Sequence, residues 1–184
     1  MKMAPVIAVV GPSGVGKDSV IQALLARASN FEGVRRVITR PHGAGGEDFD
    51  RVSDRAFQTM VQEGSFVLHW AAHGLHYGIP VAITEQRRRA DAVLVNLSRA
   101  VLPEAQKEYR ELIVISLTAD PKVLAQRLAV RGRESAADQA RRLGRATAAL
   151  PDGLNHVIEV DNSGSLDATV ETILSGLQPE RAYR

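Results

Sequence analysis

The sequence predicts an α/β protein built on a parallel five-stranded sheet core flanked by helices. Short runs of apolar and β-branched residues alternate along the chain with longer segments of helical periodicity. The apolar runs lie at 6–10, 34–38, 92–96, 112–117 and 156–160. Because parallel strands are buried on both faces, continuous apolar runs favour a parallel sheet. A chain of 184 residues suits one hydrophobic core, so we expect a single domain over 1–184.

The helices are predicted from apolar stripes and from capping residues at their starts. The helix expected at 17–28 places Val20 and Leu24 on one side. Ser53 and Ser165 stand at N-cap positions before two later helical segments. Those later helices are expected at 54–63, 120–131, 136–149 and 165–177.

The composition excludes several classes of protein. The chain has no cysteine, which excludes disulfides and thiolate metal sites. A formal net charge of +2 is too small to indicate a nucleic-acid partner, and no apolar stretch approaches the roughly 20 residues of a membrane span. We therefore expect a cytoplasmic protein with neither a nucleic-acid nor a membrane partner. Its oligomeric state is not indicated.

Residues 9–20, VVGPSGVGKDSV, contain a phosphate-binding loop between a predicted strand and a predicted helix. Gly11, Gly16 and Lys17 have the G-x-x-x-x-G-K spacing of such loops. Backbone N–H groups and the helix N-terminus bind phosphate oxygens there, and the lysine reaches the β- and γ-phosphates. We expect a nucleotide, with ATP as the default, to contact Gly11, Pro12, Ser13, Gly14, Val15, Gly16, Lys17, Asp18 and Ser19.

Asp18 occupies the position at which a serine or threonine hydroxyl usually holds Mg²⁺. A carboxylate is a hard oxygen ligand and could bind Mg²⁺ directly or through water. Alternatively, Asp18 could be favoured by the helix dipole while Ser19 takes the role of the hydroxyl. A third interpretation, a degenerate loop, conflicts with the retained lysine and glycines. We prefer a Mg²⁺ site formed by Asp18 and Ser19.

From this loop onward the chain resembles the guanylate kinase group of nucleoside monophosphate kinases over nearly its whole length. The shared motifs are GPSGVGK at 11–17, TRP at 39–41, GE at 46–47, FVLHWAAHGLHYG at 66–78, RLAVRGRE at 127–134 and ARRL at 140–143. The resemblance implies a P-loop nucleoside-monophosphate-kinase-like fold. It also implies an acceptor-binding insertion at about 34–90 and an arginine-rich lid at about 127–145.

Three departures from this group concern the residues that recognise guanine nucleotides. In guanylate kinases a tyrosine holds the acceptor phosphate, a glutamate reads the guanine edge and an aspartate assists it. The corresponding positions here are Phe49, His69 and the strand end at 95–98. A site that hydrogen-bonds its substrate discriminates by about 10⁴–10⁵-fold through buried polar partners. Loss of those partners predicts a poor guanylate kinase.

The chain keeps phosphate-binding residues but lacks base-reading residues, and in this it resembles the ribose 1,5-bisphosphate phosphokinase family of phosphonate breakdown. Its motifs have counterparts in GKDS at 16–19, ITR at 38–40, the tryptophan-to-YG segment at 70–78, VLVNLSRA at 93–100 and RGRE at 131–134. The resemblance implies phosphoryl transfer from Mg·ATP to ribose 1,5-bisphosphate, giving 5-phosphoribosyl 1-diphosphate. It implies substrate contacts from Arg40, His69, Tyr77, Asn96 and Ser98.

This reaction needs no general base, because the attacking phosphate oxygen is already ionised near neutral pH. Catalysis then depends on positioning and charge neutralisation, for which we expect Lys17, Arg127, Arg131, Arg133 and Arg142. Arg141 and Arg145 are explained equally well as solvated side chains. By family position Asn162 would lie beside the adenine, although its Asn-Ser-Gly context is also typical of a plain turn.

Two other functions stay open at this point. One is a guanylate-type nucleoside monophosphate kinase with altered base recognition, which Phe49 and His69 disfavour. The other is a non-catalytic guanylate-kinase-like module that holds a protein partner, which the intact phosphate-binding loop disfavours. The spacing of His69, His73 and His76 indicates a metal site only in a helix, and their segment instead predicts a strand and turn.

Overall fold

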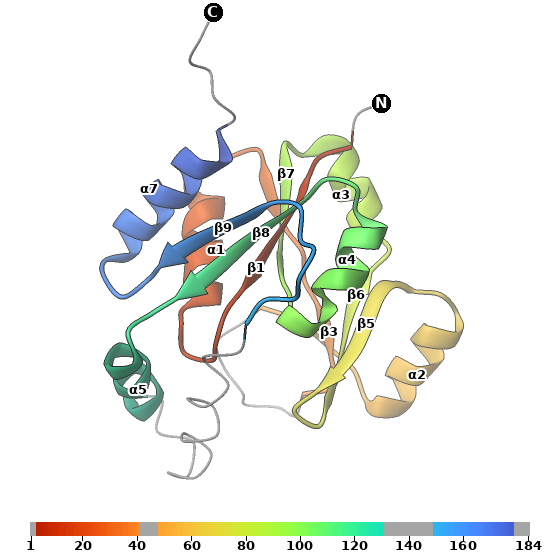
Figure 1. Ribbon diagram of the computed structural model, residues 1–184. Coiled ribbons are helices and arrows are strands. Elements are labelled where there is room, and N and C mark those ends of the chain that lie inside the picture. Colours follow the sequence, from red (N-terminus) through yellow and green to blue (C-terminus); the bar gives the residue numbers. More distant parts are fainter. Residues whose placement is uncertain (1–2, 41–47, 131–148, 179–184) are drawn as a thin grey trace, which may run out of the picture.

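A computed structural model of the chain describes residues 3–40, 48–130 and 149–178, and it confirms the predicted α/β fold (Figure 1). The central sheet has the strand order β2-β7-β1-β8-β9, and every neighbouring pair is parallel. Its strands are β1 (Val6–Val10), β2 (Phe31–Gly33), β7 (Ala92–Asn96), β8 (Leu112–Thr118) and β9 (Val157–Asp161). Their carboxyl ends meet at one edge, where ligand sites of such sheets form.

Side chains alternate along β1 and divide the core into two layers. Val6, Ala8 and Val10 belong to one buried cluster, and Ile7 and Val9 belong to the other. All five side chains are fully or almost fully buried. A strand buried on both faces must be apolar at every position, which is why VIAVV forms the centre of this sheet.

Helices cover both faces of the central sheet (Figure 1). The Ile7 side is covered by α1 (Lys17–Arg27), α5 (Pro121–Val130) and α7 (Leu166–Leu177). The opposite side is covered by α3 (Ile83–Arg89), the 3₁₀ helix η1 (Arg99–Val101) and α4 (Leu102–Glu108). Among the described residues no helix is long and apolar enough to cross a membrane.

The helix starts follow the predicted capping residues. The Ser53 hydroxyl accepts a hydrogen bond from Ala56 N at the start of α2 (Asp54–Gln62), and Ser165 accepts one from Ala168 N at the start of α7. The helices predicted at 17–28, 54–63, 120–131 and 165–177 are present within one residue at each end. The helix predicted at 136–149 lies outside the described residues apart from its last position.

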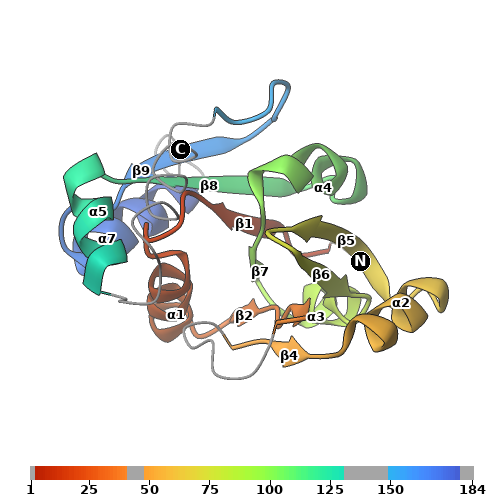
Figure 2. The same ribbon diagram turned by 90° about the horizontal axis from the view of Figure 1, so that it is seen from below.

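A second sheet in the order β4-β3-β6-β5 lies toward the opposite end of the molecule from α5 and α7 (Figure 2). It contains β3 (Val37–Ile38), β4 (Asp50–Arg51), β5 (Phe66–Ala72) and β6 (Leu75–Pro80). His73 and Gly74 join β5 to β6 with φ values of 54° and 73°. Two consecutive positive φ angles are typical of a tight hairpin turn, so the strand and turn predicted in this segment are confirmed.

The strand predicted at 34–38 is wrong in its position. The edge strand of the central sheet is β2, three residues earlier, and only Val34 N extends its pairing by donating to Leu94 O. Val37 and Ile38 instead pair in the second sheet. A Cβ on Gly33 would lie 2.9 Å from the side chain of Leu25, so glycine lets the edge strand approach α1. Glycine is not typical of strands, and the apolar pattern therefore missed β2.

Candidate functional site

The phosphate-binding loop joins β1 to α1 at the carboxyl edge of the central sheet. Gly16, at the N-cap of α1, has a φ of 99°, and a Cβ there would lie 2.8 Å from Asn162 Nδ2. A Cβ on Gly11 would lie 2.7 Å from a carbonyl oxygen of β8. Only glycine fits both positions. Lys17 Nζ donates to the carbonyl oxygens of Gly11 at 2.9 Å and Pro12 at 3.2 Å, so the ammonium group lies across the loop.

Arg127 and Asn162 support this loop from α5 and from the end of β9. Arg127 donates from Nη1 to Val15 O at 3.2 Å and from Nη2 to Asn162 O at 2.8 Å. The Asn162 side chain, only 4% exposed, donates from Nδ2 to Val15 O at 2.7 Å and accepts at Oδ1 from Thr169 Oγ1 at 2.6 Å. Both ends of the amide are thus bonded within the protein. Asn162 connects the loop to α7, and Arg127 connects it to α5.

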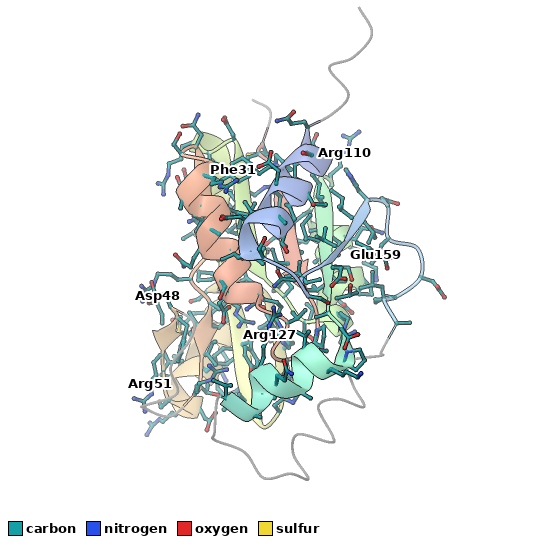
Figure 3. All side chains as sticks on the ribbon, turned by 90° about the vertical axis from the view of Figure 1, so that its left-hand side faces the viewer. Phe31, Asp48, Arg51, Arg110, Arg127 and Glu159 are labelled. Carbon is teal, nitrogen blue, oxygen red and sulfur yellow. The ribbon has the colours of Figure 1, made fainter. Side chains whose placement is uncertain are left out.

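Two cavities flank the N-terminal end of α1. The first, of about 470 Å³, is lined by Gly14, Gly16, Ser19, Gln126, Arg127, Val130, Asn162, Gly164 and Leu166. The second, of about 260 Å³, is lined by Asp18, Ile21, Gln22, Leu25, Gly33, Val34, Arg35, Asp48, Leu94 and Asn96. Figures 2 and 3 show α5, which carries Arg127, on one side of α1 and the β4 region with Asp48 on the other. We call them the α5-side cavity and the β4-side cavity.

The α5-side cavity has the residue types expected around a nucleotide. Val130 is 87% exposed and Leu166 is 38% exposed, and both apolar side chains border it. Ser19 and the backbone of Gly14 and Gly16 lie along the same cavity. An apolar surface beside a glycine-rich helix start suits a base next to its phosphates.

Asp18 and Ser19 are consecutive, but they line different cavities. Ser19 is exposed to the α5-side cavity, whereas Asp18 is half-buried at the β4-side cavity. Asn96, at the end of β7 and 7% exposed, donates from Nδ2 to Asp18 Oδ1 at 2.9 Å. Asn96 was predicted as a substrate-binding residue, and the structure brings it directly to the phosphate-binding loop.

Arg40 and Tyr77, both predicted to bind substrate, are each held against an aromatic ring. The Arg40 guanidinium carbon lies 5.4 Å from the centre of the Phe49 ring. Tyr77 is 6% exposed, and its ring stacks on Trp70 at 5.3 Å with an interplanar angle of 8°. Phe49 lacks the hydroxyl of the guanylate kinase tyrosine, but it still packs against a predicted phosphate-binding arginine. Such cation–π contacts restrict the guanidinium position.

Arg36 was not identified from the sequence, although it is the one charged residue that is buried among the described residues. It is 6% exposed, and its guanidinium carbon lies 5.1 Å from the centre of the Tyr77 ring. Buried arginines require paired or aromatic surroundings. A charged residue inside the apolar run at 34–38 was the sequence signal that could have identified Arg36. Thr169 was also missed, and its signal was a polar residue on the apolar stripe of α7.

His69 and Tyr77 point to opposite faces of the second sheet. Tyr77 is paired with Trp70, and His69 is paired with Gly78. Directly paired residues share a face, whereas consecutive residues of a strand do not. The structure therefore does not bring these two predicted substrate residues together. Among the described residues, no three His, Cys, Asp or Glu side chains form a group that could hold a metal ion.

Charged side chains beside the two cavities are held by hydrogen bonds. Arg35 donates to Asp48 and Asp50, and hydrogen bonding to Asp50 is the main cause that raises the pKa of Arg35. After β9, the Ser163 hydroxyl and N–H both donate to Asp161 Oδ1 and lower the pKa of that carboxyl. These bonds fix the segments that border the cavities.

The remaining predicted residues are placed less closely. Ser98 precedes η1 as its N-cap residue, two positions after Asn96. Pro12 and Val15 are buried within the loop, and Ser13 is half-buried. The lid arginines Arg131, Arg133 and Arg142, together with Arg141 and Arg145, lie outside the described residues.

Comparison with known proteins gives the family and the relatives of this chain. The family model described as guanylate kinase matches residues 2–179. The chain is 56% identical over 178 residues to "Ribose 1,5-bisphosphate phosphokinase PhnN" of Ruegeria sp. (strain TM1040), which covers 97% of this chain and 94% of that relative. It is 43% identical over 175 residues to the protein of the same name from Agrobacterium fabrum (strain C58 / ATCC 33970), covering 94% and 95%.

Among solved structures, the chain is similar to the guanylate kinase from Anaplasma phagocytophilum. That structure has a TM-score of 0.67 and 18% identity, with 100% of this chain and 89% of that chain covered. A gluconokinase from Sinorhizobium meliloti 1021 has a TM-score of 0.56 and 19% identity, covering 96% and 93%. At these identities the likeness concerns the fold.

Proposed function

The chain belongs to the guanylate kinase family, and we propose that within this family it is a ribose 1,5-bisphosphate phosphokinase of phosphonate catabolism. The 56% identity to the Ruegeria relative over 97% of the chain carries this proposal. In the reaction, an oxygen of the 1-phosphate attacks the γ-phosphorus of ATP, and the bond from that phosphorus to the leaving ADP breaks. The products are ADP and 5-phosphoribosyl 1-diphosphate.

The geometry of the phosphate-binding loop supports the use of ATP. The loop residues 11–17 surround a helix start whose N–H groups and dipole favour phosphate oxygens. Lys17 spans the loop and would move from the carbonyl oxygens of Gly11 and Pro12 to the β- and γ-phosphates. The α5-side cavity would then hold the adenine and ribose beside Val130 and Leu166.

The donor set beside the loop fits Mg²⁺. Asp18 supplies a carboxylate and Ser19 a hydroxyl, and Mg²⁺ prefers oxygen ligands of these kinds together with water and substrate phosphates. When bound, Mg²⁺ would supply positive charge that offsets the negative charge of the phosphates during transfer. Asp18 would contribute its carboxylate from the β4-side cavity, and Ser19 its hydroxyl from the α5-side cavity. The sequence expectation that Asp18 and Ser19 form the Mg²⁺ site thus continues as a proposal.

On the acceptor side, Arg40 would bind a phosphate of the sugar, and Phe49 would keep its guanidinium oriented. Tyr77, Asn96 and Ser98 would complete the acceptor site, and His69 stays a prediction. Arg127 would neutralise phosphate charge, together with the predicted lid arginines Arg131, Arg133 and Arg142. Because the attacking oxygen is ionised, none of these residues has to remove a proton. We assign the reaction to the cytoplasm, where ATP is supplied.

The test is a comparison of acceptors at a fixed concentration of Mg·ATP. Ribose 1,5-bisphosphate, GMP and buffer are incubated separately with the protein, ADP is measured, and the sugar product is identified by ³¹P NMR. We expect ADP and a new diphosphate signal with ribose 1,5-bisphosphate only. ADP release with GMP alone would instead establish a guanylate-type kinase, and no release with either acceptor would favour a binding module.

A further inference from the structure

The hydrogen bond between Asn96 and Asp18 joins the end of β7 to the second residue of α1, 78 positions apart in the chain. It runs from Asn96 Nδ2 to Asp18 Oδ1 at 2.9 Å. Asn96 is 7% exposed, so its amide is held by its surroundings and is not a mobile surface group. Asp18 is half-buried and borders the β4-side cavity together with Asn96. The contact therefore joins two functional positions of the fold, the phosphate-binding loop and the neighbouring strand end.

In P-loop enzymes, the same two positions usually carry a different pair of Mg²⁺-binding residues. The loop residue is a serine or threonine, and the carboxylate comes from an aspartate at the end of a neighbouring strand. Here β7 is the strand beside β1, with Val9 paired to Asn96. The loop residue is Asp18 and the strand-end residue is the neutral Asn96. The site thus has one carboxylate and one neutral group, but their positions are exchanged.

This exchange explains why the strand end carries an amide. A second carboxylate at position 96 would stand within hydrogen-bonding distance of Asp18, and two like charges at that separation repel. An asparagine of nearly the same shape replaces the repulsion with an N–H donor. The bond engages Oδ1 of Asp18, and the described residues offer no hydrogen bond to Oδ2. The carboxylate is therefore fixed at one oxygen while the other is available to a ligand.

We infer that Asn96 is the positioning residue of the Mg²⁺ site: it orients the Asp18 carboxylate, and the pair is a transposed form of the usual loop-hydroxyl and strand-carboxylate arrangement. The inference rests on the proposed use of Mg·ATP and gives Asn96 a second role beside the proposed acceptor contact, because the bond to Asp18 uses only its Nδ2. Partners that orient a metal ligand typically affect metal affinity by about 10–100-fold when they are removed.

The test measures metal binding and needs no acceptor. Mn²⁺ replaces Mg²⁺ as a spectroscopic probe, and its affinity for the complex of the protein with a non-hydrolysable ATP analogue is followed by electron paramagnetic resonance. The variants are Asn96→Leu, Asp18→Asn and the transposed double variant Asp18→Asn/Asn96→Asp. Asn30 also donates its amide to an aspartate, Asp91 Oδ2 at 3.1 Å, on an exposed part of the chain. Asn30→Leu is therefore the matched control.

We expect Asn96→Leu and Asp18→Asn each to weaken Mn²⁺ binding by about tenfold or more. The double variant should regain at least half of the loss of Asp18→Asn on a logarithmic scale, because it restores one carboxylate and one amide donor. Asn30→Leu should bind Mn²⁺ like the original protein. A melting temperature measured for every variant separates loss of folding from loss of metal affinity.

Three results would overturn the inference. Asp18→Asn with unchanged Mn²⁺ affinity would remove Asp18 from the metal site. Asn96→Leu with a lower melting temperature but unchanged Mn²⁺ affinity would mean that Asn96 does not position the metal ligand. A double variant no better than Asp18→Asn would exclude the transposition. If the acceptor assay fails but these affinities change as expected, the proposed substrate is wrong and the role of Asn96 stands.

Discussion

Replacement of Asn162 by alanine should lower both the stability of the protein and its affinity for ATP. The side chain makes two short hydrogen bonds, to Val15 O at 2.7 Å and from Thr169 Oγ1 at 2.6 Å, and it is 4% exposed. Each buried hydrogen bond contributes about 1 kcal/mol net, and an orphaned partner adds to the loss. Both partners have a substitute: Val15 O still accepts from Arg127, and the Thr169 hydroxyl can turn to Ser165 O at 3.3 Å.

Because both partners keep another hydrogen bond, the expected loss of stability equals the contribution of the two lost bonds, about 2 kcal/mol. For a chain of this size that corresponds to a decrease in melting temperature of about 4–8 °C. The assay is urea unfolding followed by circular dichroism, with ATP affinity measured separately by calorimetry. The affinity should fall because Val15 belongs to the phosphate-binding loop and is no longer tied to α7.

A double-mutant cycle with Thr169→Val tests the same reasoning, since valine keeps the shape of threonine without the hydroxyl. Asn162→Ala and Thr169→Val should couple by about 1 kcal/mol, as expected for two residues in one hydrogen-bond network. Our interpretation is refuted if the free energy of unfolding of Asn162→Ala lies within about 0.5 kcal/mol of that of the original protein and the substitution changes only the preference between adenine and guanine nucleotides. That result would return Asn162 to the base-contacting role that its family position implies.

Three further substitutions have defined outcomes. Gly16→Ala places a Cβ 2.8 Å from Asn162 Nδ2 at a φ of 99°, so it should destabilise by about 1–3 kcal/mol and abolish binding of an ATP analogue in calorimetry. Tyr109→Phe removes a buried hydroxyl that has no hydrogen-bond partner among the described residues, and burial raises the pKa of that hydroxyl. Urea unfolding should show that the free energy of unfolding increases by up to about 1–2 kcal/mol, and a decrease would contradict the prediction. The hydrogen bond from Arg89 lowers the pKa of Glu32. The stability that this bond contributes is therefore present above the ordinary carboxyl pKa and is lost as the pH falls through the lowered pKa of Glu32. Glu32→Gln should therefore be less stable at pH 7, by less than about 1 kcal/mol. The difference should shrink as the pH falls below the ordinary carboxyl pKa, and a difference that does not change with pH would contradict the assignment.

The sequence alone determined the parallel sheet, four of the helices and the phosphate-binding loop. These features depend on periodicity and on residues within a few positions of one another, such as Gly16 and Lys17 at the start of α1 or Ser53 at the start of α2. Short-range steric and capping rules are sufficient to predict them. The edge strand β2 was not predicted, because Glu32 and Gly33 leave it without an apolar pattern.

Only the tertiary structure decided which predicted residues meet. Asn96 reaches Asp18, and Arg127 reaches Val15, over 78 and 112 positions of chain, and no local pattern records such pairings. His69 and Tyr77, only eight residues apart, are separated instead by one step of strand register, which reverses the face of every side chain. Contacts of this kind are fixed by crossover connections and strand pairing, and these depend on the packing of the whole chain.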